Sequence, residues 1–196
     1  EYLRTRWGMT AVGVDPSSFL LGLGSRREKG LLFARATGEH LPFAADTLDG
    51  VLLECVLSVT GEVTAVLTEC TRVLKHGGHL IVPDVYRHAP VEPRNAEIVQ
   101  EACCLFRALR MDDLLDRLDE RGFTTVLWED HSKVLKEFAA ELILRNIPVN
   151  PAMFWPSGKR ETRWSCSSSP NTPIQEWPGY FLLVSRLDGS DETKTI

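Results

Sequence analysis

The sequence predicts an α/β fold with a mostly parallel sheet, and three observations predict it. Short apolar runs alternate along the chain with amphipathic segments of helical period. The runs are continuously apolar, as in strands that are buried on both faces of a parallel sheet. Capping and turn signals separate the apolar runs from the amphipathic segments. This order predicts repeated strand–helix–strand units with right-handed crossovers.

Length and composition are those of one ordinary globular domain. The chain has 196 residues, of which 43% are hydrophobic and 25% charged, with a net charge of −5. An acidic surface disfavours nucleic-acid and anionic-membrane partners, and no apolar run approaches the ~18 residues of a membrane span. The five cysteines are odd in number and match no disulfide or zinc pattern, which predicts no metal site and a reducing, cytoplasmic location.

The first elements follow from caps and short apolar runs. Residues 1–9 are expected to end a helix, and Thr10–Val14 to form a buried strand. Asp15–Ser18 is a helix-start signal, with an acidic N-cap and a proline at the first helical position. The helix is then expected over Phe19–Arg27, and the next strand over Leu31–Ala36.

The middle of the chain contains the clearest helix. A turn-rich segment over Thr37–Gly50 precedes a nearly continuous apolar run, Val51–Val59, which predicts another buried strand. Glu62–Lys75 is amphipathic, and His76–Gly78 is expected to end it. A strand is predicted over His79–Val85. The apolar stripe of the helix consists of Val63, Val66, Leu67, Cys70, Val73 and Leu74.

Three more helices and two more strands are expected in the second half. The helices are Asn95–Leu109, Asp112–Arg121 and Ser132–Asn146, and the strands are Thr124–Glu129 and Tyr180–Leu187. The last two strands could pair antiparallel at one edge of the sheet. Residues 148–178 are rich in Pro, Ser and polar residues, which predicts a long loop or lid inside a single domain over 1–187. Residues 188–196 are expected to be a disordered tail.

Four segments follow one another in a family-specific order. They are Ala11–Ser17 (AVGVDPS), Ala36–Phe43 (ATGEHLPF) with Asp46 and Leu48-Asp49 downstream, the run Val51–Val59, and Glu69–Val82 (ECTRVLKHGGHLIV). Together they resemble the class I S-adenosylmethionine-dependent methyltransferases, especially the small-molecule branch of the ubiquinone and menaquinone C-methylating enzymes. The resemblance covers roughly residues 1–130 and the last strand. It implies a Rossmann-like three-layer sandwich with an antiparallel edge strand.

Several features depart from the family pattern. Thr37 stands where Asp is usual, Gly38 where Ala is usual, and His76 where Pro is common. The glycine-rich motif that ends the family's central first strand is absent. Without that strand two buried strands would lose their hydrogen-bond partner. We therefore expect that upstream sequence is missing from these residues, or that another chain supplies the strand.

The resemblance implies S-adenosyl-L-methionine as the cofactor. A carboxylate at the end of a parallel strand, as expected of Asp15, can accept both ribose hydroxyls, besides capping the next helix. The segment after the next strand would border the adenine, and Glu54 would meet the methionine end or the substrate. The predicted cofactor-binding residues are Asp15, Pro16, Ser17, Thr37, Gly38, Glu39 and Glu54.

Residues near other strand ends are expected to line the acceptor pocket. Cys55, Tyr86 and His131 are the predicted substrate-binding residues. Glu54, His131 and Tyr86 are candidate bases, and the sequence does not choose a catalytic residue among them. The adjacent thiols Cys103-Cys104 could bind a soft metalloid or be redox active, or they could be buried helix residues.

The predicted function is methyl transfer to a small-molecule acceptor, with a homodimer possible. The cofactor carries the activated methyl group, so the protein has mainly to orient an acceptor of carbon, nitrogen, oxygen, sulfur or metalloid type. An alternative is a non-catalytic methyltransferase-like subunit that scaffolds a partner. A nicotinamide-dependent dehydrogenase would share the acidic strand end, but it would not explain the Leu41–Phe43 segment.

Overall fold

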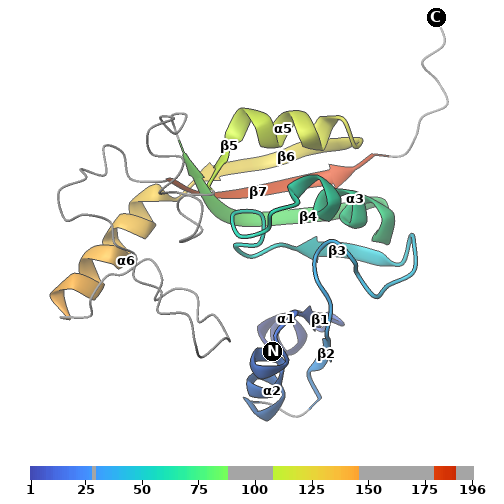
Figure 1. Cartoon of the computed structure of the whole chain (residues 1–196), viewed down its shortest axis with the longest axis horizontal. Coiled ribbons are helices and arrows are strands. Elements are labelled where there is room, and N and C mark those ends of the chain that lie inside the picture. Colours follow the sequence, from blue (N-terminus) through green and yellow to red (C-terminus); the bar gives the residue numbers. More distant parts are fainter. Residues whose placement is uncertain (28–29, 88–107, 146–178, 189–196) are drawn as a thin grey trace, which may run out of the picture.

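A computed structural model describes residues 1–27, 30–87, 108–145 and 179–188. The predicted α/β class is confirmed, with parallel strand pairs, antiparallel pairs on one side and helices between strands (Figure 1). The predicted helix Asn95–Leu109 lies almost wholly outside the described residues. Most of the predicted lid and tail, together with Cys103 and Cys104, lies outside them too.

The N-terminal elements form a small two-stranded unit. It consists of α1 (Tyr2–Trp7), β1 (Val12–Val14), α2 (Ser18–Arg27) and β2 (Leu32–Ala34). β1 and β2 pair in parallel, with Val12 opposite Leu32. No described residue before Leu53 is buried, so this unit contributes no side chain to the core.

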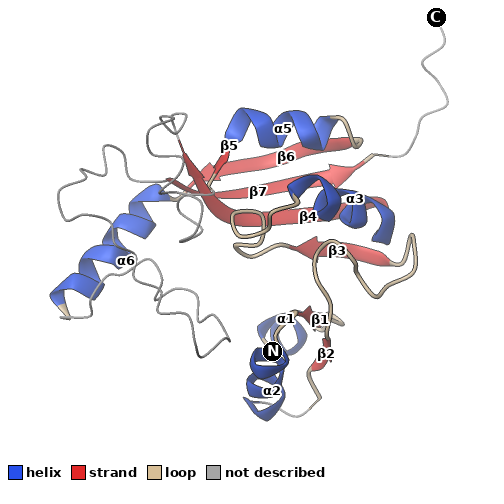
Figure 2. Ribbon diagram, in the orientation of Figure 1, coloured by secondary structure: helices blue, strands red, loops and turns tan. Residues whose placement is uncertain are grey.

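The main sheet has the order β3-β4-β7-β6, with the short β5 beside the end of β4 (Figure 2). Its strands are β3 (Leu48–Leu52), β4 (Leu74–Arg87), β5 (Leu109–Arg110), β6 (Phe123–Asp130) and β7 (Gly179–Leu187). β3 and β5 run parallel to β4, whereas β7 is antiparallel to both β4 and β6. The expected antiparallel edge is therefore confirmed.

Three helices accompany the main sheet: α3 (Val63–Val73), α5 (Met111–Asp119) and α6 (Ser132–Leu144). The predicted apolar stripe of α3 is its buried face, with Val66, Leu67 and Cys70 fully buried. Leu114 and Leu118 of α5 belong to the same core cluster, so α3 and α5 pack against the sheet together. Among the described residues, no helix combines the length and apolar character that crossing a bilayer requires.

The predicted strand Val51–Val59 is wrong in its bounds. β3 ends at Leu52, and Cys55 has a φ of 51°, which turns the chain out of the extended conformation. Leu53 and Leu57 are nevertheless buried in the core. The run is apolar because it is a core-packed loop, and burial alone does not distinguish such a loop from a strand.

The predicted turn at His76–Gly78 lies inside a strand. β4 begins at Leu74, directly after α3, and Gly77 has a φ of 77°. Leu74 pairs with Leu48, but the next pair is His79 with Gly50, so the extra residues form a bulge. Glycine is favoured at this left-handed position, as the turn prediction assumed.

The sheet is divided in two among the described residues. β1 pairs with β2, β3 pairs with β4, and no hydrogen-bonded ladder joins the two groups. β1 and β3 each therefore have one edge without a strand partner in this part of the chain.

Candidate functional site

Asp15 lies directly after β1, at the carboxyl end of the parallel β1–β2 pair. Its backbone N–H donates to the Ala34 carbonyl at 3.3 Å, and its Oδ1 accepts the Ser17 N–H at 2.7 Å. The Ser17 hydroxyl in turn accepts the Leu20 N–H at 3.3 Å, so Ser17 caps α2 directly. The half-buried Asp15 carboxylate thus braces the turn with one oxygen, and no hydrogen bond to described residues engages Oδ2.

The Thr37–His40 turn follows β2 and packs against α3. The His40 N–H donates to the Thr37 carbonyl at 3.2 Å. A Cβ added at Gly38 would lie 3.2 Å from Val66 Cγ2, so a larger residue there would push the turn away from the helix. Glu39 Oε1 accepts the Thr60 hydroxyl at 2.6 Å, and this bond lowers the pKa of Glu39. Glu39 is thus tied to the loop after β3.

An ion pair on α3 holds the segment after this turn. Arg72 donates to both carboxylate oxygens of Glu69, from Nε and from Nη2, each at 2.7 Å. The same guanidinium donates to the carbonyls of Phe43 at 2.8 Å and Leu41 at 3.1 Å, and Glu69 accepts the Leu41 N–H at 2.9 Å. These bonds, chiefly those from Arg72, lower the pKa of Glu69 to about 2. The Glu69–Arg72 pair therefore joins two of the four family-like segments, a role that was not predicted from the sequence.

The loop after β3 carries Glu54 and Cys55. Cys55 is half-buried and donates its N–H to the Pro83 carbonyl at 2.9 Å, whereas Glu54 is exposed. The fully buried Asp84 accepts the Ser58 N–H at 3.0 Å and its neighbour's N–H, from Val85, at 2.7 Å. Burial raises the pKa of Asp84, although these hydrogen bonds oppose the shift. Asp84 thereby fixes the shape of the loop that presents Glu54 and Cys55.

Tyr86 and His131 lie at the ends of β4 and β6, the two strands that flank β7. Tyr86 is near the carboxyl end of β4, and His131 follows β6. The His131 N–H donates to the Tyr180 carbonyl at 2.7 Å, and its Nε2 lies 2.9 Å from Glu129 Oε2. Burial raises the pKa of Tyr180 to about 12, and nearby Cys55 adds to the shift. The predicted substrate-binding residues, which come from the ends of three strands, are thus grouped around the start of β7. They are Cys55, Tyr86 and His131.

The structure places the predicted residues in two groups. Asp15, Pro16 and Ser17 belong to the β1–β2 unit, whereas Glu54, Cys55, Tyr86 and His131 belong to the carboxyl end of the main sheet; the turn Thr37–Glu39 connects the two through α3 and Thr60. Within the described ranges, no hydrogen bond or ion pair links Asp15 to Thr37 or Glu54. No group of three or more metal-ligating side chains occurs among those residues either.

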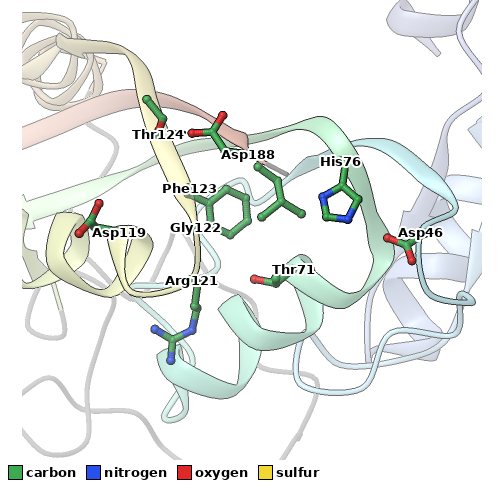
Figure 3. Close-up of a pocket in the computed structure, with 10 residues that line it drawn as sticks. Asp46, Thr71, His76, Asp119, Arg121, Gly122, Phe123, Thr124 and Asp188 are labelled. Atoms are coloured by element: carbon green, nitrogen blue, oxygen red, sulfur yellow. Dashed lines mark hydrogen bonds between the residues drawn. The ribbon is translucent and has the colours of Figure 1, made fainter. Parts of the chain in front are cut away.

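A hollow of about 470 Å³ lies at the other end of the main sheet (Figure 3). Its walls come from the ends of α3 and α5, the start of β6 and the end of β7. The lining residues are Asp46, Thr71, His76, Asp119, Arg121, Gly122, Phe123, Thr124, Leu187 and Asp188. No predicted site residue is among them, so this hollow is not the predicted site.

Asp130, Ser132 and Gly179 belong to the same group of residues as Tyr86 and His131, although they were not predicted as site residues. Asp130 Oδ1 accepts the Ser132 N–H at 2.8 Å, and the Tyr180 N–H donates to the Ser132 hydroxyl at 3.1 Å. An Asp-x-Ser sequence before a helix is an N-cap signal that could have drawn attention to the first two. No sequence signal could have identified Gly179, whose importance depends on the side chain opposite it.

The matching family model and the similar curated proteins named here are all methyltransferases. The family model described as "Methyltransferase domain" matches residues 1–82. The chain is 34% identical over 89 residues to the arsenite methyltransferase of Halobacterium salinarum, and 34% identical over 94 residues to the demethylmenaquinone methyltransferase of Thermobifida fusca. These matches cover 44% and 45% of this chain but only 22% and 39% of the relatives, so the chain spans well under half of their length.

Solved structures share the fold over nearly the whole chain. Phosphoethanolamine N-methyltransferase 2 of Haemonchus contortus, in complex with S-adenosyl-L-methionine, has a TM-score of 0.69 at 14% identity, covering 95% of this chain and 45% of that one. The [4+2]-cyclase SpnF has a TM-score of 0.64 at 21% identity, covering 90% and 65%. The predicted Rossmann-like fold is therefore confirmed. The match over residues 1–82 and the shared fold show that this chain resembles the class I S-adenosylmethionine-dependent methyltransferases and has their fold.

Proposed function

We propose that this protein transfers a methyl group from S-adenosylmethionine to a small-molecule acceptor. One observation carries the proposal: Asp15 and the Thr37–Glu39 turn follow adjacent parallel strands, β1 and β2, at the same end of the pair. The carboxyl ends of parallel strands are where nucleoside cofactors bind in open α/β sheets. The family match over the same residues supports this reading.

The cofactor-binding roles follow from the contacts of each residue. Asp15 is assigned to the ribose hydroxyls, because Ser17 engages Oδ1 and leaves Oδ2 to accept a hydrogen bond. Pro16 and Ser17 line the same edge. Thr37 and Gly38 are assigned to the adenine, and Glu54 to the methionine end, since it is exposed just beyond β3. Glu39 acts through its bond to Thr60, which fixes the turn.

The acceptor is assigned to the carboxyl end of the main sheet. Cys55, Tyr86 and His131 gather there around the start of β7. The bound cofactor would supply an activated methyl group, and these side chains would orient the acceptor for in-line attack. The net charge of −5 favours a small molecule over a nucleic acid or an anionic membrane. A single domain over 1–187, a cytoplasmic location and a homodimer belong to the same proposal.

A non-catalytic scaffold is the second candidate, and two observations favour it. Among the residues that the structure describes, the β1–β2 unit that carries Asp15 has no buried residue and no ladder to the main sheet. The structurally similar SpnF is named for a cyclisation, so the fold does not by itself specify methyl transfer. A scaffold would bind a partner protein and would not need a competent cofactor site.

Calorimetric titration with S-adenosylmethionine distinguishes the two candidates. Methyl transfer requires that the wild-type chain bind the cofactor, and that Asp15→Ala weaken binding about 10–150-fold, the effect of losing hydrogen bonds to a charged group worth about 1.5–3 kcal/mol. Asp113→Ala, which removes an exposed carboxylate on α5, is the matched control and should bind like wild type. Absence of binding by the wild-type chain would reject the enzymatic proposal in favour of the scaffold.

A further inference from the structure

Tyr86 and Asp130 form a polar pair across the carboxyl end of the main sheet. The Tyr86 hydroxyl donates to Asp130 Oδ2 at 3.3 Å, although 44 residues separate the two in sequence. Tyr86 is buried near the end of β4, whereas Asp130 is exposed as the last residue of β6. The pair therefore connects a phenol inside the protein with a carboxylate in contact with solvent.

The surrounding side chains hold the Tyr86 ring in place. Trp128 and Phe181 pack edge-to-face against it, with ring centroids 6.4 Å and 6.0 Å away. Gly179 lies opposite Tyr86 in the β4–β7 ladder. A Cβ added to Gly179 would lie only 2.1 Å from Tyr86 Cε1. Glycine at this position of β7 therefore makes room for the Tyr86 ring. Residues of β4, β6 and β7 thus fix the position of the phenol together.

The two carboxylate oxygens of Asp130 have different partners. Oδ1 accepts the Ser132 N–H at 2.8 Å and the Ser132 hydroxyl, which together cap the start of α6. Oδ2 accepts the Tyr86 hydroxyl. Capping a helix needs only one oxygen. The cap therefore does not require the bond between Oδ2 and Tyr86.

We propose that Tyr86 and Asp130 form a proton-accepting pair for the methyl acceptor. This rests on the proposed methyl transfer and narrows its substrate class to molecules that lose a proton from oxygen, nitrogen or carbon when they are methylated. Tyr86 contacts the acceptor, and Asp130 is a positioning residue that acts through Tyr86. The exposed carboxylate returns the proton to water.

For a ring hydroxyl acceptor such as a quinol, every proton is accounted for. The acceptor O–H proton passes to Tyr86 Oη, while the Tyr86 proton passes to Asp130 Oδ2. The released electron pair drives the neighbouring ring carbon onto the methyl group, and the sulfur–methyl bond breaks with its electron pair remaining on sulfur. The ring carbon then loses its hydrogen to water, and the oxygen regains a proton. One proton is released for each methyl group transferred.

The resting state of the phenol fits a relay. Burial, as the largest cause, raises the pKa of Tyr86, so the hydroxyl is protonated at neutral pH. A protonated phenol can accept one proton and pass another on in the same step. The distance of 3.3 Å exceeds the usual 2.5–3.0 Å of an O–H···O bond, and such bonds often shorten when the acceptor binds.

The test uses the full chain with reduced 1,4-naphthoquinone as the acceptor and methyl-labelled S-adenosylmethionine as the donor. Tyr86→Phe should lower kcat by about 10²–10⁴-fold, the range typical of a lost general base, with the calorimetric Kd for S-adenosylmethionine unchanged. Asp130→Asn can still accept the Tyr86 hydrogen bond but not its proton, so it should lower kcat similarly. Asp130→Glu should restore part of the rate. Tyr2→Phe and Asp116→Asn, both at exposed positions, are the controls.

A solvent deuterium isotope effect separates a relay from a structural tie. The effect on kcat should be present in wild type and reduced in Tyr86→Phe and Asp130→Asn. If both variants transfer the methyl group with the wild-type kcat and the wild-type isotope effect, the proposed pair is overturned but the proposed function is not. A wild-type chain that binds S-adenosylmethionine but methylates no reduced naphthoquinone overturns the quinol as acceptor, and with it the relay written for a ring hydroxyl. A wild-type chain that does not bind S-adenosylmethionine overturns the proposed function itself.

Discussion

At the scale of single residues, Arg72 ties α3 to the segment Leu41–Phe43. Its guanidinium forms two bonds to Glu69 and one each to the carbonyls of Leu41 and Phe43. A planar fork makes such paired bonds, whereas a lysine ammonium is a point charge. Arg72 therefore fixes the segment that follows the Thr37–His40 turn.

Arg72→Lys tests this geometry because it keeps the charge and removes the fork. We expect the free energy of unfolding to fall by about 1.5–3 kcal/mol, as for lost hydrogen bonds to charged groups. Urea denaturation followed by circular dichroism measures the change. Arg26→Lys, on the exposed face of α2, is the matched control and should have almost no effect. Equal stability of the two variants would show that the fork does not hold the segment.

The Glu69 pair also predicts a dependence of stability on pH. In the folded chain the pKa of Glu69 is lowered to about 2 from an ordinary value of 4.5. The stabilisation is therefore fully present above about pH 4.5, and it is lost as the pH falls toward 2. The difference in unfolding free energy between wild type and Glu69→Gln should shrink between pH 6 and pH 3. A constant difference over that range would contradict the assignment.

Residues next to a strand end could be predicted, and residues that depend on register could not. Asp15 was located correctly after β1 because the apolar run ends there and a proline follows. The pairing of Tyr86 with Asp130 requires the β4–β7–β6 register and the missing side chain at Gly179. The spacing of residues along the sequence indicates neither the register nor the need for a glycine at position 179.

At the scale of elements, the loop after β3 shows how a buried polar group replaces a strand ladder. Asp84 supplies acceptors to the N–H groups of Ser58 and Val85, which are buried with it. Beyond Leu52, the N–H groups of Leu53 and Cys55 still donate to the β4 carbonyls of Ile81 and Pro83, and Asp84 supplies the acceptor for Ser58. The sequence pattern indicates that Leu53 and Leu57 are buried, but it does not indicate which acceptors satisfy the backbone.

Asp84→Ala should destabilise the chain strongly for that reason. Each orphaned buried donor costs about 1–3 kcal/mol, so the midpoint of urea denaturation should fall well below that of wild type. Asp84→Asn keeps one carbonyl acceptor and should lose less. Asp119→Ala, at the exposed last residue of α5, serves as the control. If Asp84→Ala unfolds at the wild-type midpoint, the loop is held by its apolar side chains alone.

At the scale of the whole molecule, the two sheets differ in how much they bury. β4 and β7 carry a large part of the core, including the fully buried Leu80, Val82, Phe181 and Leu183. β1 and β2 contain no buried residue. Local opening requires little free energy where few apolar contacts are lost. The order of the helices and strands could be predicted from sequence, but this division could not, because it depends on which strands pair.

Amide hydrogen exchange tests the division directly. Amides of β1 and β2 should exchange much faster than those of β4 and β7, and binding of S-adenosylmethionine should slow exchange in β1 and β2. Mass spectrometry of peptides from residues 12–34 and 79–87 gives the comparison. Equal protection of both regions in the free chain would show that the β1–β2 unit is stabilised by contacts outside those described.

Every role proposed for this protein depends on where S-adenosylmethionine binds, and chemical-shift mapping measures that location. With backbone amides assigned, titration should shift Asp15, Ser17 and Gly38 together, with one common saturation curve. Residues around the hollow at the opposite end of the sheet, such as Thr71 and Gly122, should remain unchanged. Shifts confined to that hollow, or no shifts at Asp15, would contradict the assignment of the carboxyl end of β1 as the cofactor site.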